Sequence, residues 1–420
     1  MRKIILTLTG LLSCAILYAQ ETTVPVQETE KPSIGPKMIV ESLKGPITPN
    51  ELAAFKAHIA AVNVPDHNDG NIWVYGNPGK IIEACGLMYE ATGDKAILDR
   101  MLYYCDAALA GRNDLASEKD GGQRPTWSGK IDPVWPSSKA GVKPASAGVA
   151  VGSVLAHILY GAKVILANPT IWNETVGSGN PHSFGATYKE RALKYVKECD
   201  YVADSWMLPT FVRADKKFYF PGPPNDYKPG EAVPWNQICM FTNGLVRLAE
   251  CHDLLKDAPE KSKLYTDLVK VNFDWFKSTV VHGTSAAGTP VWKFKYALIS
   301  RMEDTNHFAY DSEGMYLAYI NGKCGVTLQD MTIMANTYFD VVLTTVKDGK
   351  FAGNVDGSTG TGHAGGDNYV RDEYIYLADI RKDQFNKVGE IEQAAKKIAV
   401  SPQITARLLW LKNKRFKAGM

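Results

Sequence analysis

The chain has no excess of charge of either sign. Its 420 residues include 47 lysines and arginines against 45 aspartates and glutamates, a formal net charge of +2. Such a balance argues against nucleic acid or an anionic membrane surface as the main partner, because both are bound through a net positive field. Any recognition of an acidic ligand must therefore rely on local clusters of basic residues.

Several motifs that define large enzyme classes are also missing. The chain has no Walker or Gly-Xaa-Ser-Xaa-Gly sequence. Residues 66–70 resemble the start of a calcium loop but lack the distal glutamate, so we interpret them as a turn. His363 and Asp367 have no partner at metal-ligand spacing. We expect no metal and no other cofactor.

Beyond the N-terminus the chain has no apolar run long enough to span a bilayer. At the N-terminus two basic residues precede an apolar stretch over 4–17, the pattern of a secretory signal peptide over 1–20. Cys14 gives a near match to a lipoprotein signal, which leaves a lipid anchor open. The polar, proline-rich stretch 21–49 predicts a disordered leader. We expect a periplasmic or secreted protein without other membrane attachment.

Cysteine is scarce and shows no Cys-Xaa-Xaa-Cys pattern. Six cysteines follow the signal peptide, most of them at apolar positions of expected helices, where cysteine behaves as a small hydrophobe. They are Cys85, Cys105, Cys199, Cys239, Cys251 and Cys324. An exported protein can form disulfides, but this spacing favours free buried thiols.

Strand signals are few, whereas helical periodicity recurs along the chain. We expect Asn50 to cap a helix whose apolar residues share one face, and the Thr92-Gly93-Asp94 break separates two helices over 80–91 and 97–109. Further helices are expected over 146–167, 184–206, 235–255, 260–279, 310–321, 327–345, 369–380, 384–398 and 402–412. This rhythm predicts an all-α, monomeric single domain over 50–420, an (α/α) toroid or barrel of about six to seven antiparallel helix pairs.

Long loops interrupt the rhythm over 111–145, 168–183, 213–234 and 346–368, and long loops in a compact domain are usually functional or disordered. The first interleaves basic and aromatic residues, and we expect these to bind a sugar chain at one rim of the ring. The alternative is ordinary solvated loops. The candidates are Arg124, Trp127, Lys130 and Trp135, with His363, Tyr369 and Arg371 at the last loop.

The segment 301–310 places an arginine, a histidine and a tyrosine just ahead of a helical pattern. Arg301 suits a carboxylate partner, His307 a base, and Tyr310 an acid. These are the groups that β-elimination of a uronic-acid polymer needs. Individually, the histidine can be a structural hydrogen-bonding residue and the tyrosine a packing residue. Glu303 and Asp304 can anchor Arg301 or cap the next helix.

A second set of polar residues opens the helix expected over 235–255. Asn236 and Gln237 lie at its start, where free N–H groups attract anions, and Asn243 lies two turns further on. They can hold a uronate carboxylate and neutralise the charge that develops on it. The alternative is a capping amide for Asn236 and a packing amide for Asn243.

An asparagine at a helix start, paired with a later arginine and tyrosine, resembles the α/α-barrel alginate lyases of polysaccharide lyase family 5. The long loops and exported form are more similar to the alginate and glucuronan lyases of family 38. The resemblance implies that Asn236 neutralises the substrate carboxylate. Gln237 stands where family 5 has a histidine, so His307 or a tyrosine would have to serve as the base.

The sequence thus predicts a polysaccharide lyase whose partner is an acidic polysaccharide such as alginate or glucuronan. Two other functions remain open. A glycoside hydrolase on the same scaffold would use a carboxylate pair from Glu303, Asp304 and Asp311. A non-catalytic glycan-binding protein would bind the same polymers without turnover.

Overall fold

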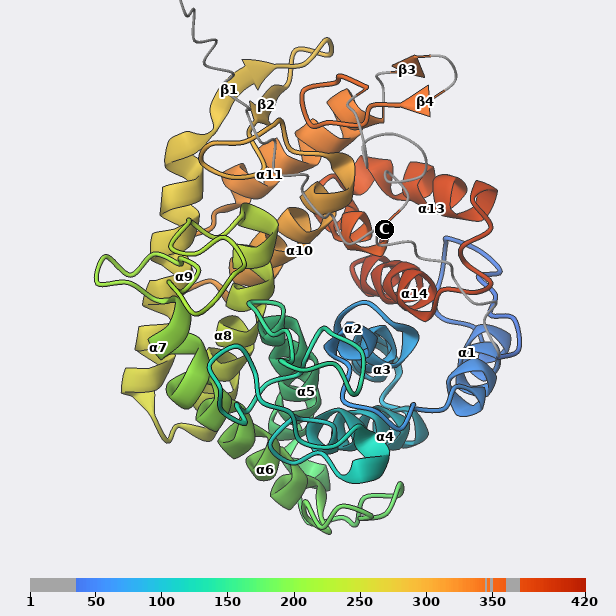
Figure 1. Cartoon of the computed structure of the whole chain (residues 1–420). Coiled ribbons are helices and arrows are strands. Elements are labelled where there is room, and N and C mark those ends of the chain that lie inside the picture. The colour runs from blue at the N-terminus through green and yellow to red at the C-terminus, as the bar shows by residue number, and fades with distance from the viewer. Residues whose placement is uncertain (1–34, 344–345, 348–349, 360–370) are drawn as a thin grey trace, which may run out of the picture.

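The computed structural model describes residues 35–343, 346–347, 350–359 and 371–420, and it is mostly helical (Figure 1). This confirms the predicted all-α class. The longer helices are α1 (Pro49–Ala61), α3 (Asn77–Thr92), α4 (Lys95–Ala110), α5 (Val151–Leu166), α6 (Tyr188–Val202), α8 (Trp235–Leu255), α9 (Pro259–Thr279), α10 (Thr305–Asn321), α11 (Leu328–Asn336), α13 (Phe385–Ala394) and α14 (Pro402–Lys417). The shorter ones are α2 (Gly70–Val74), α7 (Leu208–Phe211) and α12 (Leu377–Ile380).

Two small antiparallel hairpins accompany the helices. The first pairs β1 (Val281–Thr284) with β2 (Pro290–Lys293), in a register that sets Val281 opposite Lys293. The second pairs β3 (Val346–Lys347) with β4 (Lys350–Phe351). After β2 the chain makes a further extended turn, in which Lys295 pairs with Met302, and this turn leads directly into α10.

The helix contacts form a closed circuit. α3 contacts α5, α5 contacts α8, and α8 contacts α10; α10 contacts the 372–376 turn, which contacts α14, and α14 returns to α3. A second helix follows several of these along the chain and packs against it, as α4 does on α3, α6 on α5, and α9 on α8. Figure 1 shows these helices arranged around a central region.

Two glycines set the position of α8 within this circuit. A Cβ atom on Gly152 of α5 would lie 2.4 Å from the Met240 carbonyl oxygen of α8. A Cβ atom on Gly314 of α10 would lie 2.4 Å from the Cys239 Cβ atom of α8. Only glycine permits such close approach of two helix backbones. α8 is therefore held tightly between α5 and α10, which fixes its first turn relative to the start of α10.

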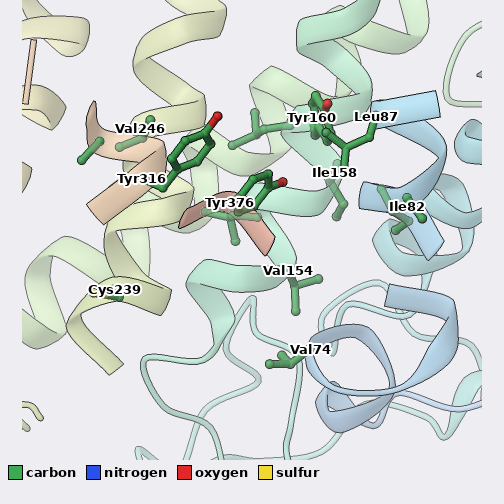
Figure 2. Close-up of a cluster of buried hydrophobic side chains, with 14 of the residues drawn as sticks. Val74, Ile82, Leu87, Val154, Ile158, Tyr160, Cys239, Val246, Tyr316 and Tyr376 are labelled. Carbon is green, nitrogen blue, oxygen red and sulfur yellow. The ribbon is translucent and has the colours of Figure 1, made fainter. Parts of the chain in front are cut away.

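The core is formed by apolar and aromatic side chains from the helices of the circuit (Figure 2). Tyr316 of α10 stacks on Tyr376 with ring centroids 4.5 Å apart, which ties α10 to the turn before α12. All six cysteines of residues 35–420 are buried and free, as the sequence predicted. Burial raises the pKa of the Cys239 thiol well above its usual value, so it stays protonated.

The structured chain begins earlier than predicted. The leader was expected to be disordered through residue 49, but Met38 is buried and its N–H donates to the Ala399 carbonyl at 3.1 Å. The expected signal peptide over 1–20 lies outside the described residues. None of the described helices is both long and apolar enough to cross a membrane.

The first residues of the helices show where the predicted boundaries were correct and where they were not. α8 runs over 235–255 as predicted, whereas α10 starts at Thr305 rather than at residue 310. The capping residue of α1 is Thr48, which forms a capping box with Glu51, and not Asn50. The early start of α10 places His307 inside its first turn.

Candidate active site

Asp304 organises the first turn of α10. Its Oδ1 accepts the backbone N–H groups of Asn306 and His307, each at 3.0 Å, which caps the helix. Its Oδ2 lies 2.8 Å from the His307 Nδ1 and 3.1 Å from the Arg301 guanidinium. Asp304 therefore both caps the helix and anchors Arg301, the two roles that the sequence suggested for this pair of acidic residues.

The Asp304 carboxylate also sets the chemical state of His307. Burial alone would raise the pKa of Asp304, but the bonds from His307 and the charge of Arg301 outweigh it and lower that pKa. An ionised Asp304 accepts the Nδ1 proton, which leaves Nε2 as the proton acceptor of the ring. The His307 side chain is 20% exposed, so Nε2 is placed to act as a general base.

Tyr296 lies beside this histidine, with ring centroids 4.8 Å apart. Its backbone is fixed on both sides, because its N–H donates to the Arg301 carbonyl at 3.0 Å and its carbonyl accepts the Trp235 N–H at 3.3 Å. Burial raises the pKa of the Tyr296 phenol, so it is protonated at neutral pH and can act as an acid.

The start of α8 reaches the same place. The Gln237 side chain lies close enough to the Tyr296 phenol to influence it, and the preceding residue, Asn236, is only 3% exposed. The Asn236 Oδ1 has no hydrogen-bond partner in the structure. Three of the residues predicted as a site thus adjoin one tyrosine, Gln237, Arg301 and His307, and Asn236 is next to Gln237 in the chain. Two cations border the Tyr296 ring, Arg301 and Lys228, each 5.6 Å from its centroid.

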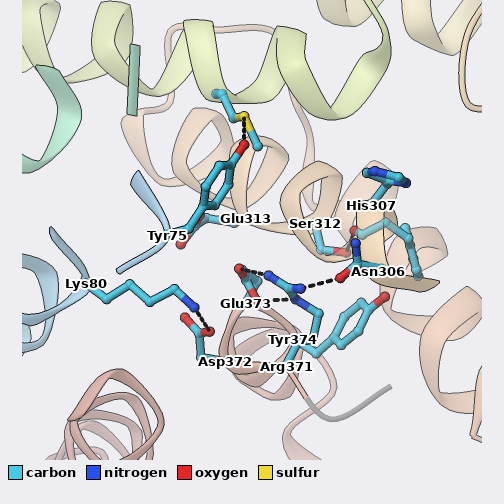
Figure 3. Close-up of polar contacts among 12 residues, drawn as sticks. Tyr75, Lys80, Asn306, His307, Ser312, Glu313, Arg371, Asp372, Glu373 and Tyr374 are labelled. Carbon is cyan, nitrogen blue, oxygen red and sulfur yellow. Dashed lines mark hydrogen bonds and ion pairs between the residues drawn. The ribbon is translucent and has the colours of Figure 1, made fainter. Parts of the chain in front are cut away.

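Tyr310 belongs to a neighbouring group centred on Arg371. The Arg371 guanidinium lies 4.8 Å from the Tyr310 ring centroid and makes a bidentate pair with Glu373 at 3.0 and 3.1 Å. It also donates to Asn306, next to His307 (Figure 3). Tyr75 packs edge-on against Tyr310 with centroids 6.0 Å apart. Both groups therefore adjoin the first turns of α10.

A small charged cavity lies beneath Tyr310 and includes Asn243 in its wall. Its volume is about 40 Å³, enough for a few water-sized molecules and too little for a sugar ring. Arg407 crosses it to pair with Glu83 at 2.9 Å and with Glu313. Asn243 is buried and its Oδ1 has no hydrogen-bond partner in the structure. A polymer could reach only the outer end of this cavity.

The expected binding residues of the 111–145 loop do not form an exposed surface. Arg124 is 1% exposed and donates to the carbonyl oxygens of Asn68, Lys139 and Val142. Trp135 is 2% exposed and its indole N–H donates to the Ala108 carbonyl at 2.6 Å. The prediction that these two side chains face a sugar is wrong, because each is the internal link of a folded loop. Trp127 is half-buried and Lys130 is exposed.

Two of the predicted residues, His363 and Tyr369, lie outside the described residues.

Within the described residues, Glu303, Asp304 and His307 are the group whose ligand atoms could surround a metal ion, all within 4.8 Å of one another. The acceptor atoms of this group are largely used by the protein itself. The Glu303 Oε1 accepts the Asp304 N–H at 3.0 Å, and both Asp304 oxygens accept bonds from α10 or Arg301. A bound cation would have to displace Arg301, so we interpret the group as an oriented histidine.

The carboxylates considered for hydrolysis do not flank an open site. Glu303, Asp304 and Asp311 are all buried, and they lie close enough for the charges of Asp304 and Asp311 to act on Glu303. Burial raises the pKa of Asp311 to about 8 and that of Glu303 well above its usual value. A glycosidase pair must instead stand apart on two sides of a sugar. This geometry does not favour hydrolysis by these residues.

Tyr296 was not among the residues predicted for the site. Its signal was present, because the alternating run Val291-Trp-Lys-Phe-Lys-Tyr296 precedes Arg301 at a spacing suited to an antiparallel return. Nothing in this run marked the tyrosine as facing the histidine.

Comparison of the chain with protein-family models, with curated proteins and with solved structures finds no match.

Proposed function

We propose that this protein is a polysaccharide lyase that cleaves a polyuronate, such as alginate or glucuronan, by β-elimination. The observation that carries the proposal is the contact between the Asp304-oriented imidazole of His307 and the Tyr296 phenol, with the Gln237 amide at the same phenol. A base, an acid and an amide around one point are what this reaction requires.

In the proposed reaction the His307 Nε2 takes the proton from C5 of the uronate. The C4–O4 bond then breaks, a C4–C5 double bond forms, and the leaving oxygen takes a proton from a phenol. Arg301, Gln237 and Asn236 are the groups available to stabilise the negative charge that develops on the substrate carboxylate. Lys228 adds positive charge at the same place, which favours an acidic polymer over a neutral one.

Two phenols are candidates for the acid. The sequence pointed to Tyr310, but the Tyr310 ring packs against Arg371 and Tyr75, whereas Tyr296 is in contact with the base itself. Because acid and base must act on adjacent carbons of one sugar, we propose Tyr296 as the acid. Tyr310 then helps to position Arg371 and Asn306.

We further propose that the scaffold is an (α/α) toroid of about six to seven antiparallel helix pairs. The closed circuit of helix contacts supports this, with α3, α5, α8, α10 and α14 on the inside and α4, α6 and α9 outside. In such a ring the first turns of α8 and α10 would open at one rim, where an extended polymer can reach them. The apolar N-terminal stretch is consistent with export to where such polymers occur.

The test is to incubate the protein with alginate and with glucuronan and to follow the ultraviolet absorbance of the unsaturated product. Tyr296→Phe should lower kcat by about 10²-fold or more, and Tyr310→Phe by much less, because only the first loses the proton donor. The reverse order would assign the acid to Tyr310.

Other outcomes would reject the lyase. Reducing ends without unsaturation would indicate a hydrolase. Binding without turnover, unchanged in His307→Ala, would indicate a glycan-binding protein. An absence of any product from either polyuronate would remove the proposal altogether.

A further inference from the structure

A second and much larger cavity lies on another part of the molecule. Its volume is about 640 Å³, within the range of small-molecule sites, and it shares no lining residue with the cavity beneath Tyr310. It lies between α4, the 115–120 segment and the 178–184 segment. In Figure 1 these elements are at the α4 and α6 side, away from α10.

A buried arginine fixes one wall of this cavity. Arg191 of α6 is fully buried and pairs with Asp106 of α4. It also donates to the Gly179 carbonyl at 2.9 Å and to the Gly185 carbonyl at 2.6 Å. Buried hydrogen bonds from a charged guanidinium hold a loop far more firmly than exposed contacts do. The 178–184 wall is therefore preorganised relative to α4.

The lining combines aromatic rings with hydroxyl and carboxylate groups. His182 stacks on Phe184 with centroids 5.4 Å apart, and Tyr103 of α4 adds a phenol, one face of which is covered by Arg100 at 4.2 Å. Ser117 and Asp120 come from the facing segment, where the Ser117 hydroxyl donates to Asp120 at 2.5 Å. A sugar site is typically lined by aromatic rings, which pack against the C–H faces of the sugar, and by a few acceptors, which bind its hydroxyl groups.

The charges around the cavity offer no net attraction to an acidic ligand. Asp106 is neutralised by Arg191, and Asp66 lies 3.8 Å from Lys119. Asp120 has no cationic partner among the described residues. Burial lowers the pKa of His182, so its ring is neutral at pH 7. Arg100 on Tyr103 donates to backbone carbonyls and adds one positive charge, and Lys194 near Phe184 is paired with Glu198. The charges around the cavity therefore balance, whereas two cations border the Tyr296 ring.

We propose that this cavity is a second carbohydrate site, which binds a short uncharged oligosaccharide. Asp120 accepts hydrogen bonds from sugar hydroxyls, and the Phe184 and Tyr103 side chains provide the apolar contact. The site is independent of the polyuronate reaction, since none of its residues contacts the His307 group.

The experiment is calorimetric titration of the whole protein with neutral trisaccharides: β-1,4-glucan, β-1,4-mannan, β-1,3-glucan and α-1,4-glucan fragments. A polyuronate trisaccharide serves as the charged comparison. The titrations are made on the His307→Ala variant as well as the wild type, so that binding is scored independently of catalysis. At least one neutral trisaccharide should bind, with equal affinity to both proteins.

Variants then place the binding. Asp120→Ala should weaken it about tenfold or more, because a charge-assisted hydrogen bond is lost, and Phe184→Ala should also weaken it. Phe184 packs partly against the core, so its removal also affects the fold. Asp120→Asn keeps the shape of the side chain and removes only its charge, and it therefore separates binding from folding. Leu193→Ala is the matched control, an exposed α6 residue outside the cavity, and should bind as the wild type does.

Three results would overturn the proposal: no binding of any neutral trisaccharide, binding that is unchanged in both Asp120 variants, or binding that is lost in His307→Ala. Binding of the polyuronate alone, at the Asp120 site, would also overturn it. A failure of the lyase assay leaves this proposal untouched, because its readout is affinity.

Discussion

Two segments of this protein have the same kind of composition and opposite roles. Residues 111–145 and residues 294–310 both interleave basic residues with aromatic side chains. In the first, Arg124 is 1% exposed and its donors are used by backbone carbonyls of the loop. In the second, Arg301 is 38% exposed and beside a histidine that keeps one nitrogen for chemistry. The contacts of a side chain in the folded structure, and not its neighbours in sequence, decide whether it stabilises the fold or takes part in the reaction.

The largest effect on activity is expected for a substitution in residues 294–310. His307→Ala should lower kcat on the polyuronate by about 10²–10⁴-fold, because the general base is removed. The free energy of unfolding should fall by about 1 kcal/mol, because the hydrogen bond between His307 and Asp304 is lost. Steady-state kinetics and urea denaturation measure the two. A kcat within about threefold of the wild type would show that 294–310 is not the reacting segment.

The corresponding substitution in residues 111–145 is Arg124→Ala. We expect the free energy of unfolding to fall by about 3 kcal/mol, because several buried carbonyl oxygens lose their donor at once. The kcat of the folded protein should stay within about threefold of the wild-type value. Urea denaturation followed by circular dichroism, with kinetics on the folded fraction, tests this. A fully stable variant with lost activity would place Arg124 in the substrate site after all.

Asp304→Asn separates the two roles of one residue. Asparagine caps a helix as well as aspartate does, so stability should be nearly kept. The neutral amide no longer fixes the His307 tautomer, and kcat should fall at least about tenfold. Asp304→Ala, the control, should lose the cap as well, about 1 kcal/mol. Equal activity of the asparagine variant and the wild type would contradict the oriented-histidine interpretation.

The buried carboxyl pair behind the site predicts a pH dependence. The folded-state pKa of Asp311 is raised to about 8, so the folded protein binds more protons than the unfolded chain between about pH 4 and pH 8. Stability should therefore be fully present below pH 4 for this group and fall as pH rises to 8. Asp311→Asn should reduce that fall by at least about 1 kcal/mol. Denaturation at pH 5 and pH 8 compares the slopes, and equal slopes would contradict the assignment.

The smallest expected effect belongs to the exposed part of the 111–145 loop. Lys130→Ala should raise KM less than about threefold and leave stability unchanged, since an isolated exposed charge contributes about 0–1 kcal/mol. A tenfold rise in KM, measured on alginate at low salt, would restore this loop as a polymer-binding surface.

Much of the fold could be predicted from the sequence, and part of the site. The periodicity of 235–255 gave α8 its bounds, and the apolar settings of the cysteines predicted free thiols. We placed the start of α10 too late, because we took it from the apolar pattern after residue 310 and not from the capping residue Asp304. Trp135 was expected at the surface because a tryptophan in a long polar loop has no sequence signal for the Ala108 carbonyl that binds it.

The sequence by itself determined the helical class, the thiol state and the residue types available for acid–base chemistry, because periodicity and composition are properties of the chain alone. Only the tertiary structure decided that Tyr296 meets His307, and that Arg124 does not meet solvent. The first depends on the turn before α10, which folds Tyr296 back onto the first turn of that helix. The second depends on the backbone carbonyl oxygens of Asn68, Lys139 and Val142, which take up the Arg124 donors. Local propensity carries no information about such pairings.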